Sequence, residues 1–364
     1  MENIEVFVVG NSKKELDRHM KVEGRNILHL AIQSKRIGKI PPEDNEEMRG
    51  RYKRARMYLE WMDTSLEMTP QIKKDYNMEK VIKLIFHDPQ TRLPADIQQR
   101  ARELYNKWTE DNWGESTVVD DESAEPDALD TPAAAEQAPL LQAELPPRDH
   151  AIYGVEGIMH GVIMVRGVNG RKVYRLDPRF PKKSAKVYGH NGIPLGTWFA
   201  TQLVALHRGA HGMRIGGISG NQITGAYSII VSDSYEDLDK DRGYTIYYSG
   251  SNSHNNDNPN APGESSGGTL ALKASMRTGQ PVRVLRSGGS AITAKKGCWL
   301  PDCGIRYDGL YRVVELLTPT NTKGGLYEQF KLVRDRDQTP LEELIRRSPT
   351  PQQKFDLEAF QRGS

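Results

Sequence analysis

Cysteine is scarce in this chain of 364 residues, which has only Cys298 and Cys303. Two thiols exclude a disulfide-rich scaffold and any module built on cysteine-rich zinc clusters, and no histidine lies near them in sequence to complete a metal site. The chain also lacks an apolar run near the ~20 residues that span a bilayer, and its first residues include acids where a secretory signal is basic. We expect a soluble, intracellular protein with no metal or other cofactor and no membrane partner.

Basic residues are absent from one long stretch. Residues 109–147 hold eleven Asp and Glu side chains and no Lys or Arg, whereas residues 150–334 hold 23 basic and 13 acidic side chains. The stretch is rich in Ala and Pro and poor in aromatics, so it cannot bury enough apolar surface to offset the entropy lost on folding. This composition predicts a disordered acidic linker over residues 113–149. The basic region beyond it favours a polyanionic partner, with an ordinary solvated surface as the alternative.

Helical patterning dominates residues 1–112, after one short strand expected at 6–9. Apolar side chains recur at helical spacing in 78–86, and Pro94 stands where a first helical residue tolerates proline. Ile97, Ala101, Leu104 and Trp108 then follow at intervals of three or four. These residues predict an all-α bundle domain over 1–112. Its last helix resembles the N-terminal helical bundle of transcription elongation factor S-II, with a generic bundle as the alternative.

Short β-rich runs, separated by glycine, asparagine and proline turns, fill the chain beyond residue 150. They lie at 226–232, 244–249, 281–286, 311–317 and 327–333. Regular short strands of this kind are typical of a barrel or sandwich. We expect a further short strand within 199–208 and a helical turn within 268–278. A proline-rich C-terminal tail, 335–364, is predicted to be peripheral, with one helix at 341–347.

Three collinear motifs give this β-rich region a specific resemblance. They are Tyr188-Gly-His with Ile193-Pro-Leu-Gly-Thr-Trp-Phe199, Gly217-Ile-Ser-Gly220 with Gly225-Ala-Tyr-Ser-Ile-Ile-Val-Ser232, and Arg306-Tyr-Asp-Gly-Leu-Tyr311. In this order they resemble the SRA (SET- and RING-associated, or YDG) domain. The resemblance implies a PUA-like, mainly-β barrel with a few short helices over residues 150–334. It also implies that this domain binds methylated duplex DNA, flips 5-methylcytosine out of the helix and holds it in a pocket.

The resemblance further implies which residues hold the base. Tyr235 and Tyr248 match the two tyrosines that sandwich it, and base–aromatic stacking is worth about 1–3 kcal/mol. A carboxylate accepts hydrogen bonds from the amino edge of cytosine. Asp239 is the first candidate for this carboxylate. Asp237 and Asp241 are rivals, because the loop is one residue longer than is usual in the family.

Small polar residues complete the expected pocket. Ser249 would offer a backbone N–H to the base carbonyl, and Ser251 would line the methyl site. Ser232 and Asp233 stand where the family usually has glycines, so they could crowd the base or add a polar contact. A buried methyl contributes only ~0.8 kcal/mol, so methyl recognition must also depend on the shape of the pocket.

Two loops would enter the grooves of the DNA. Ile215 matches the side chain that the family inserts into the vacated space, with Arg214 beside it. The second loop, 252–260, contains no Lys or Arg, unlike that of family members with hemimethyl preference. Asn255 and Asn256 could read base edges there, and an ordinary flexible loop is the alternative. Basic residues expected to contact phosphate are Arg208, Arg283, Arg286, Lys295 and Lys296.

No catalytic signature accompanies these residues. The zinc deaminase motif is absent, and no stretch has the alternating pattern of a methyltransferase cofactor domain. We therefore expect a non-catalytic nuclear reader of 5-methylcytosine in duplex DNA, foremost at hemimethylated CpG. Residues 1–112 would recruit a DNA methyltransferase or another chromatin protein. The alternatives are a methyl-DNA or modified-base reader without hemimethyl preference and, more distantly, a PUA-like RNA-binding module.

Overall fold

The computed structural model describes residues 2–7, 9, 13–110, 113, 140–166, 172–214, 216–232, 238–250, 253–289 and 299–363. These residues divide into two compact units. The first comprises the described residues up to 113 together with 140–146 and 163–178, and the second comprises 147–162 and the described residues from 179 onward. Within these ranges, no helix has the length and apolar character that crossing a membrane requires.

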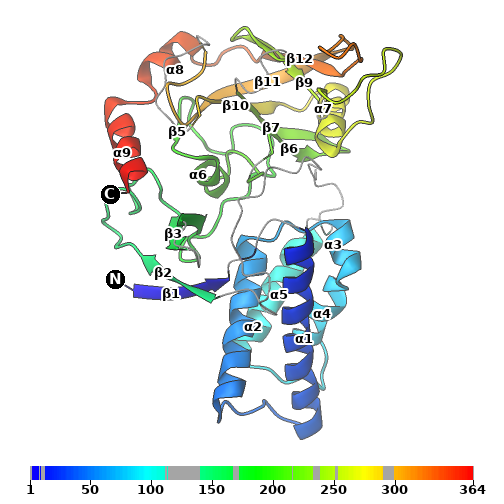
Figure 1. Ribbon diagram of the computed structural model, residues 1–364, viewed down its shortest axis with the longest axis vertical. Coiled ribbons are helices and arrows are strands. Elements are labelled where there is room, and N and C mark those ends of the chain that lie inside the picture. The colour runs from blue at the N-terminus through cyan, green and yellow to red at the C-terminus, as the bar shows by residue number, and fades with distance from the viewer. Residues whose placement is uncertain are drawn as a thin grey trace. The chain divides into compact units, whose positions relative to one another are not determined.

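Five helices make up most of the first unit. They are α1 (Lys13–Ile37), α2 (Glu46–Thr64), α3 (Pro70–Asp75), α4 (Met78–Phe86) and α5 (Ala95–Glu110). The long helices run side by side (Figure 1), and their apolar faces share one core, in which Leu59 and Ile82 are fully buried. Asn45 starts α2 by accepting a hydrogen bond from the Met48 N–H, a common N-cap. The predicted helical bundle is confirmed, with α4 at the residues expected.

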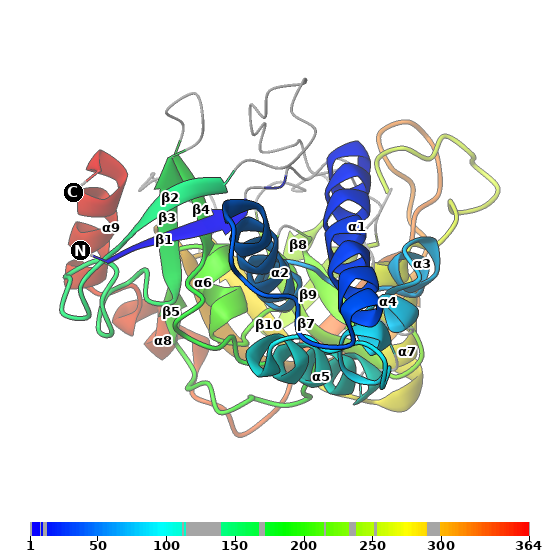
Figure 2. The same ribbon diagram turned by 90° about the horizontal axis from the view of Figure 1, so that it is seen from below.

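A four-stranded sheet also belongs to the first unit, so the unit is not all-α as predicted. Its order is β1 (Glu2–Phe7), β2 (Leu140–Leu145), β3 (Val162–Arg166) and β4 (Lys172–Leu176). Figure 2 shows these strands side by side. The strands β1 and β2 are antiparallel, and their register runs from Glu2 opposite Leu145 to Phe7 opposite Leu140.

This sheet changes the predicted domain boundaries. Strand β2 lies within residues 113–149, which were predicted to be linker, and β3 and β4 come from the predicted second domain. The average composition of the acidic stretch concealed one short run, Leu-Leu-Gln-Ala-Glu-Leu, that can pair with β1. Residues 114–139 of the predicted linker lie outside the described residues.

The second unit is built on an eight-stranded sheet. Its order is β6 (Ile218–Asn221), β7 (Gly225–Val231), β10 (Val282–Ser287), β11 (Ile305–Leu317), β12 (Gln329–Arg334), β9 (Thr245–Ser249) and β8 (Lys240–Asp241), with β5 (Trp198–Phe199) paired to β11. Only β7 and β10 are parallel among the described pairs. Helix α7 (Gly267–Thr278) packs on β6, β7 and β11 (Figure 1). The five predicted β runs are confirmed, and closure of the sheet into a PUA-like barrel stays a prediction.

Two other predictions about this unit differ from the structure. The strand expected within 199–208 is instead mostly the short helix α6 (Gln202–His207), because Thr201 caps it by accepting a hydrogen bond from the Val204 N–H. The C-terminal tail forms the predicted helix α8 (Leu341–Arg347) and also α9 (Pro351–Arg362). Leu344 and Leu357 are each 1% exposed, so the tail is part of the second unit and not peripheral.

Candidate functional site

Pairing of β8 with β9 brings Asp239 next to Ser249. Lys240 pairs with Tyr247, so the preceding residue, Asp239, lies beside the end of β9. The Ser249 N–H donates to Asp239 Oδ1 at 2.6 Å, and Asp239 remains partly exposed. The carbonyl of Leu238 accepts from the Gln329 amide at 2.6 Å, which fixes the chain just before Asp239. The carboxylate is therefore held in one place by its own strand neighbours. The Ser249 N–H, predicted to donate to the base carbonyl, donates to Asp239 in this conformation.

Asp241, a rival of Asp239, has a structural role. Its two oxygens accept from Arg286 Nε at 2.7 Å and Arg286 Nη2 at 2.8 Å. Its Oδ1 also accepts from the Gly243 N–H at 2.9 Å. A carboxylate bound in this way cannot face a ligand without breaking a buried ion pair. Asp239 is the better-placed of these two, and Asp237 lies outside the described residues.

Tyr248 joins β9 to β7 and contributes to the core. Its hydroxyl donates to the Ile230 carbonyl at 3.2 Å, and only 8% of the residue is exposed. A Cβ at Gly217 would lie 2.7 Å from the Tyr248 hydroxyl oxygen, so this turn of the chain requires glycine. Ser232 follows β7 and is partly exposed. Three other predicted pocket residues, Asp233, Tyr235 and Ser251, lie outside the described residues.

The partly exposed Gln202 and the buried His211 hold the loop that carries Arg214. The Gln202 amide donates to the carbonyls of Met213 at 3.1 Å and Gly216 at 2.9 Å. His211 Nε2 lies 2.8 Å from the same Gly216 carbonyl. Arg214 itself is partly exposed, and Ile215, the predicted inserting residue, lies outside the described residues. The loop is thus anchored on both sides of its predicted tip.

His211 is neutral and has a defined tautomer. A carbonyl only accepts, so Nε2 must carry the proton, and Nδ1 accepts from the Ser228 hydroxyl at 2.9 Å. Burial, with a smaller contribution from the charge of Arg283, lowers the pKa of His211 to about 4. Sequence reasoning missed both Gln202 and His211, since nothing in their spacing distinguishes them from ordinary core residues.

The match to a known family covers this entire region. Residues 187–338 match the family model of the SAD/SRA domain. This part of the chain is a SAD/SRA domain. A UHRF1-like protein of Cryptococcus neoformans var. grubii is 36% identical over 171 residues, which are 43% of this chain and 48% of that protein. The E3 ubiquitin-protein ligase ORTHRUS 2 of Arabidopsis thaliana is 31% identical over 152 residues, 40% of this chain and 22% of that protein.

The chain therefore spans about half, or less, of the length of these relatives. Similar solved structures include the modification-dependent TagI restriction endonuclease, at a TM-score of 0.36 and 29% identity over 43% of this chain and 54% of that one. The SRA domain of SUVH5 in complex with methylated CHH DNA gives a TM-score of 0.33 and 29% identity, over 43% of this chain and 98% of that one.

Two arginines of the SRA domain that were predicted to contact phosphate are buried. Arg283 is 0% exposed and donates to backbone carbonyls, including those of Ala185 at 2.6 Å and Gly189 at 2.8 Å. Arg286 is also 0% exposed and binds Asp241. The prediction was wrong for both, because the count of basic residues does not show which of them the sheet encloses. Arg208 is exposed and stays a candidate, while Lys295 and Lys296 lie outside the described residues.

The motif Arg306-Tyr-Asp-Gly builds the interior of the SRA domain. Asp308 accepts from Arg286 Nη1 at 2.9 Å and from Arg306 Nε at 2.5 Å, and all three residues are 0% exposed. Tyr307 bonds to His190 Nδ1 at 2.7 Å. Residues two apart on a strand share a face, so the Arg306/Asp308 contact could have been found from the sequence. The side chains of this motif are therefore core residues of the domain.

The second loop is bound to the domain's own main chain. The Asn256 side-chain amide donates to the carbonyls of Leu326 at 2.7 Å and Ala261 at 2.8 Å. Its predicted role in reaching a DNA groove is therefore wrong for this conformation, because its donors are already used. Asn255 is exposed and remains available.

The described groups of the candidate site are suited to binding a ligand. A partly exposed carboxylate, a tyrosine ring and backbone polar groups suit a flat heterocycle with an amino edge. In the described part of the chain, no three His, Cys, Asp or Glu side chains are grouped so as to hold a metal ion. The site's acceptor, Asp239, accepts a hydrogen bond from the Ser249 backbone N–H.

Proposed function

We propose that the SRA domain binds 5-methylcytosine in duplex DNA with the base turned out of the helix. The observation that carries the proposal is the Asp239 carboxylate, fixed by the Ser249 N–H beside Tyr248 in a domain of this family. Flipping a base costs a few kcal/mol, and stacking on a tyrosine recovers about 1–3 kcal/mol. Tyr248 and Tyr235 would supply the ring surfaces, and Asp239 would accept from the amino group of the base.

The anchored loop supports the other half of this mechanism. A base that leaves the stack leaves a gap, and a side chain that fills the gap slows the return of the base. Ile215 would take that place, with Arg214 near the backbone of the DNA. Gln202 and His211 hold the residues on both sides of Ile215, so the loop would enter the groove without first losing conformational freedom.

Hemimethylated CpG is the first candidate target. Rejection of a second methyl requires a group that reaches the opposite strand, and the second loop is the natural source of such a group. Because Asn256 is bound to the carbonyls of Leu326 and Ala261, the structure favours a second candidate as well. That candidate is a reader of methylated DNA without hemimethyl preference.

We further propose that the chain acts in the nucleus as a non-catalytic reader. The helical bundle would recruit a DNA methyltransferase or another chromatin protein. Several curated relatives are named E3 ubiquitin-protein ligases, but the matched region is only about a fifth of their length. Nothing in that region of similarity requires ligase activity of this chain.

The proposal is tested by titrating the full chain with duplexes that carry no, one or two methyl groups at one CpG, and with an RNA duplex, at two salt concentrations. We expect the hemimethylated duplex to bind most tightly, and 2-aminopurine beside the methylated base to brighten as stacking is lost. Equal affinity for every DNA duplex would contradict methyl reading. Equal affinity for duplexes with one and with two methyl groups would support a reader of methylated DNA without hemimethyl preference.

Substitutions at Tyr248 and Asp239 test the location of the site, and substitutions at Tyr247 and Asp257 are the controls. Tyr248→Ala should weaken methyl-DNA binding at least about fivefold through lost stacking, while Tyr248→Phe, which keeps the ring, should bind nearly as well as wild type. Tyr247→Ala is the matched control, because Tyr247 is the neighbouring, partly exposed tyrosine on β9. Asp239→Asn should weaken binding, and Asp257→Asn, an exposed carboxylate elsewhere, should not.

A further inference from the structure

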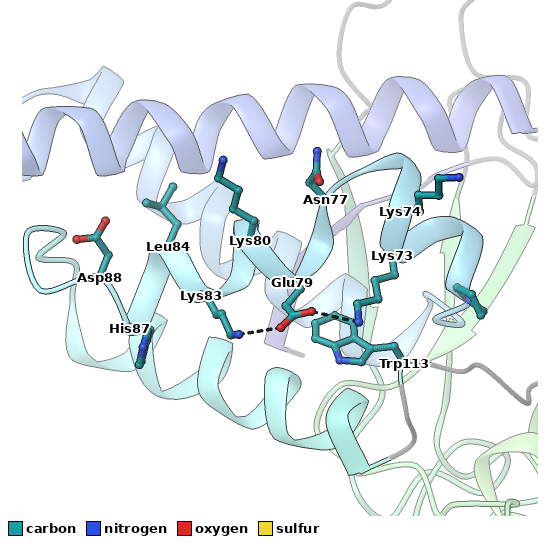
Figure 3. A pocket seen from close by; sticks show the side chains of 11 residues that line it. Lys73, Lys74, Asn77, Glu79, Lys80, Lys83, Leu84, His87, Asp88 and Trp113 are labelled. Carbon is teal, nitrogen blue, oxygen red and sulfur yellow. Dashed lines mark hydrogen bonds and ion pairs between the residues drawn. The ribbon is translucent and has the colours of Figure 1, made fainter.

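The first unit has a pocket of its own, with a volume of about 760 Å³. Helices α3 and α4 and Trp113 line it, as Figure 3 shows. Four lysines lie around it: Lys73, Lys74, Lys80 and Lys83. The volume is within the range of about 300–1,000 Å³ that is usual for ligand sites.

Two of these lysines share one carboxylate within the protein. Glu79 lies between them and pairs with Lys73 at 3.1 Å and with Lys83 at 2.7 Å (Figure 3). The Lys73 ammonium also lies 4.6 Å from the centroid of the Trp113 ring. These contacts fix the centre of the pocket, where two lysines and one glutamate leave one net positive charge.

The other two lysines, Lys74 and Lys80, add positive charge that no carboxylate of the pocket pairs with. Lys74 and Lys80 are exposed, and within the described ranges neither makes an ion pair or a hydrogen bond. Figure 3 shows both ammonium groups directed away from Glu79. Leu84 lies beside Lys80 and offers apolar surface, and Asn77 lies between Lys80 and Lys74 (Figure 3). Pro70 also lines the pocket. The pocket thus combines two unpaired positive charges at its rim with an apolar lining.

We propose that this pocket binds an acidic peptide segment of a partner protein. Carboxylates of the peptide would pair with Lys74 and Lys80, and an apolar side chain next to the carboxylate at Lys80 would contact Leu84. A nucleic-acid backbone fits less well, because it places a charge at every phosphate and would bring them against the carboxylates of Glu79 and Asp88. The proposal does not depend on DNA reading by the SRA domain.

The test uses the full chain and a labelled synthetic peptide with two glutamates and a leucine among neutral residues, compared with the same peptide carrying glutamines. The glutamate peptide should bind more tightly, and its affinity should fall as salt is raised. The double variant Lys74→Gln/Lys80→Gln should weaken binding about tenfold, the loss of two exposed ion pairs of ordinary strength. Glu79→Gln frees Lys73 and Lys83, so it should tighten binding about threefold.

The matched control is Arg25→Gln/Lys39→Gln, which removes two exposed positive charges elsewhere in the same unit and should leave peptide affinity unchanged. Circular dichroism would verify that each variant is folded. Equal binding of the two peptides would overturn the proposal, as would equal loss in the Lys74/Lys80 and control variants. An unmethylated duplex that loses affinity in the Lys74/Lys80 variant, but not in the control, would identify a nucleic-acid surface instead.

Discussion

One buried histidine of the helical bundle and one of the SRA domain are accommodated in opposite ways. In the bundle, His19 is 1% exposed and neither ring nitrogen has a hydrogen-bond partner among the described residues. Its neighbours are aromatic rings, with the centroid of Trp61 at 4.5 Å. In the SRA domain, His211 is 0% exposed, and its nitrogens bond to Ser228 and Gly216. The ring nitrogens of His19 thus have no hydrogen bonds in the described structure, whereas the ring of His211 joins Ser228 to Gly216.

The arginines extend this contrast. Arg283, Arg286 and Arg306 are each 0% exposed in the SRA domain and bind carbonyls or Asp308. Buried polar groups are costly unless they are bonded, and fully bonded networks fix one arrangement. The SRA interior is therefore specified by polar contacts that also support the loops of the candidate site. The bundle core is specified mainly by apolar and aromatic packing.

Asp308→Asn should cause the largest loss of stability in the SRA domain. The substitution removes the negative charge between Arg286 and Arg306, and removing one partner from a buried ion pair typically costs 3–5 kcal/mol. We expect the free energy of unfolding of the SRA domain to fall by about that amount, while the bundle is unaffected. Hydrogen exchange of core amides, which reports each unit separately, measures both quantities.

Asp335→Asn is the control for this prediction. Asp335 pairs with Arg312 at 3.0 Å, but the Arg312 side chain is 46% exposed. Exposed pairs contribute about 0–1 kcal/mol, so little stability should be lost. If the two variants lose the same stability, the buried network is not what specifies the SRA interior.

Acid should reduce the stability of both units through their histidines. A free histidine has a pKa near 6.5, whereas burial lowers the pKa of His211 to about 4 and that of His19 to about 3. Because both folded pKa values are lowered, this stability is complete above pH 6.5 and is lost as the pH falls toward the folded values. At pH 4.5 each histidine should cost roughly 3 kcal/mol.

Urea unfolding at pH 7 and pH 4.5 tests this expectation, again with amide exchange to separate the units. The variants His19→Leu and His211→Leu cannot titrate, so each should lose less stability between the two pH values than the wild type does in the same unit. An equal loss in the wild type and the variant would assign the acid sensitivity to carboxylates instead.

The sequence predicted the helices and strands whose signals are local. The helix at 78–86 follows from its apolar spacing, and the β runs follow from their glycine and proline boundaries. Strand β2 escaped prediction because its partner, β1, is more than a hundred residues away and its surroundings are acidic. The short apolar run that becomes α6 is compatible with strand or helix, and only the Thr201 cap decides between them.

The candidate site was predicted in part, because residue type indicates chemistry but not burial. Asp239 and Asp241 offer the same carboxylate chemistry, and the structure separates them because Arg286 binds both oxygens of Asp241. Likewise, Arg283 and Arg208 both suit phosphate, yet the sheet encloses Arg283 and leaves Arg208 exposed. Such differences arise from contacts between distant segments, which neither spacing nor composition records.

Gln202→Ala should loosen the anchored loop of the SRA domain. It removes two hydrogen bonds, to the carbonyls of Met213 and Gly216, each worth about 0.5–1.5 kcal/mol. We expect a loss of about 1–3 kcal/mol in stability, and weaker binding of methylated duplexes because the loop must be ordered on binding. Gln338, whose amide bonds to Leu310 away from this loop, provides the control Gln338→Ala, which should affect stability alone. Equal DNA binding by the two variants would refute a positioning role for Gln202.

His19→Leu should change stability least, and comparing it with His211→Leu tests whether the two histidines differ. Leucine has nearly the volume of histidine and removes two nitrogens that have no partner in the described structure, so the desolvation cost of the ring disappears. The lost edge contacts with aromatic rings act in the opposite direction by about 0.5–1.5 kcal/mol. At pH 7 the bundle should therefore stay within about 1 kcal/mol of wild type. The same substitution at His211 removes one of the two donors to the Gly216 carbonyl and leaves the Ser228 hydroxyl without its acceptor, and should cost about 2–4 kcal/mol. Equal losses of stability at the two positions in urea unfolding would show that the hydrogen bonds of His211 do not distinguish it from His19.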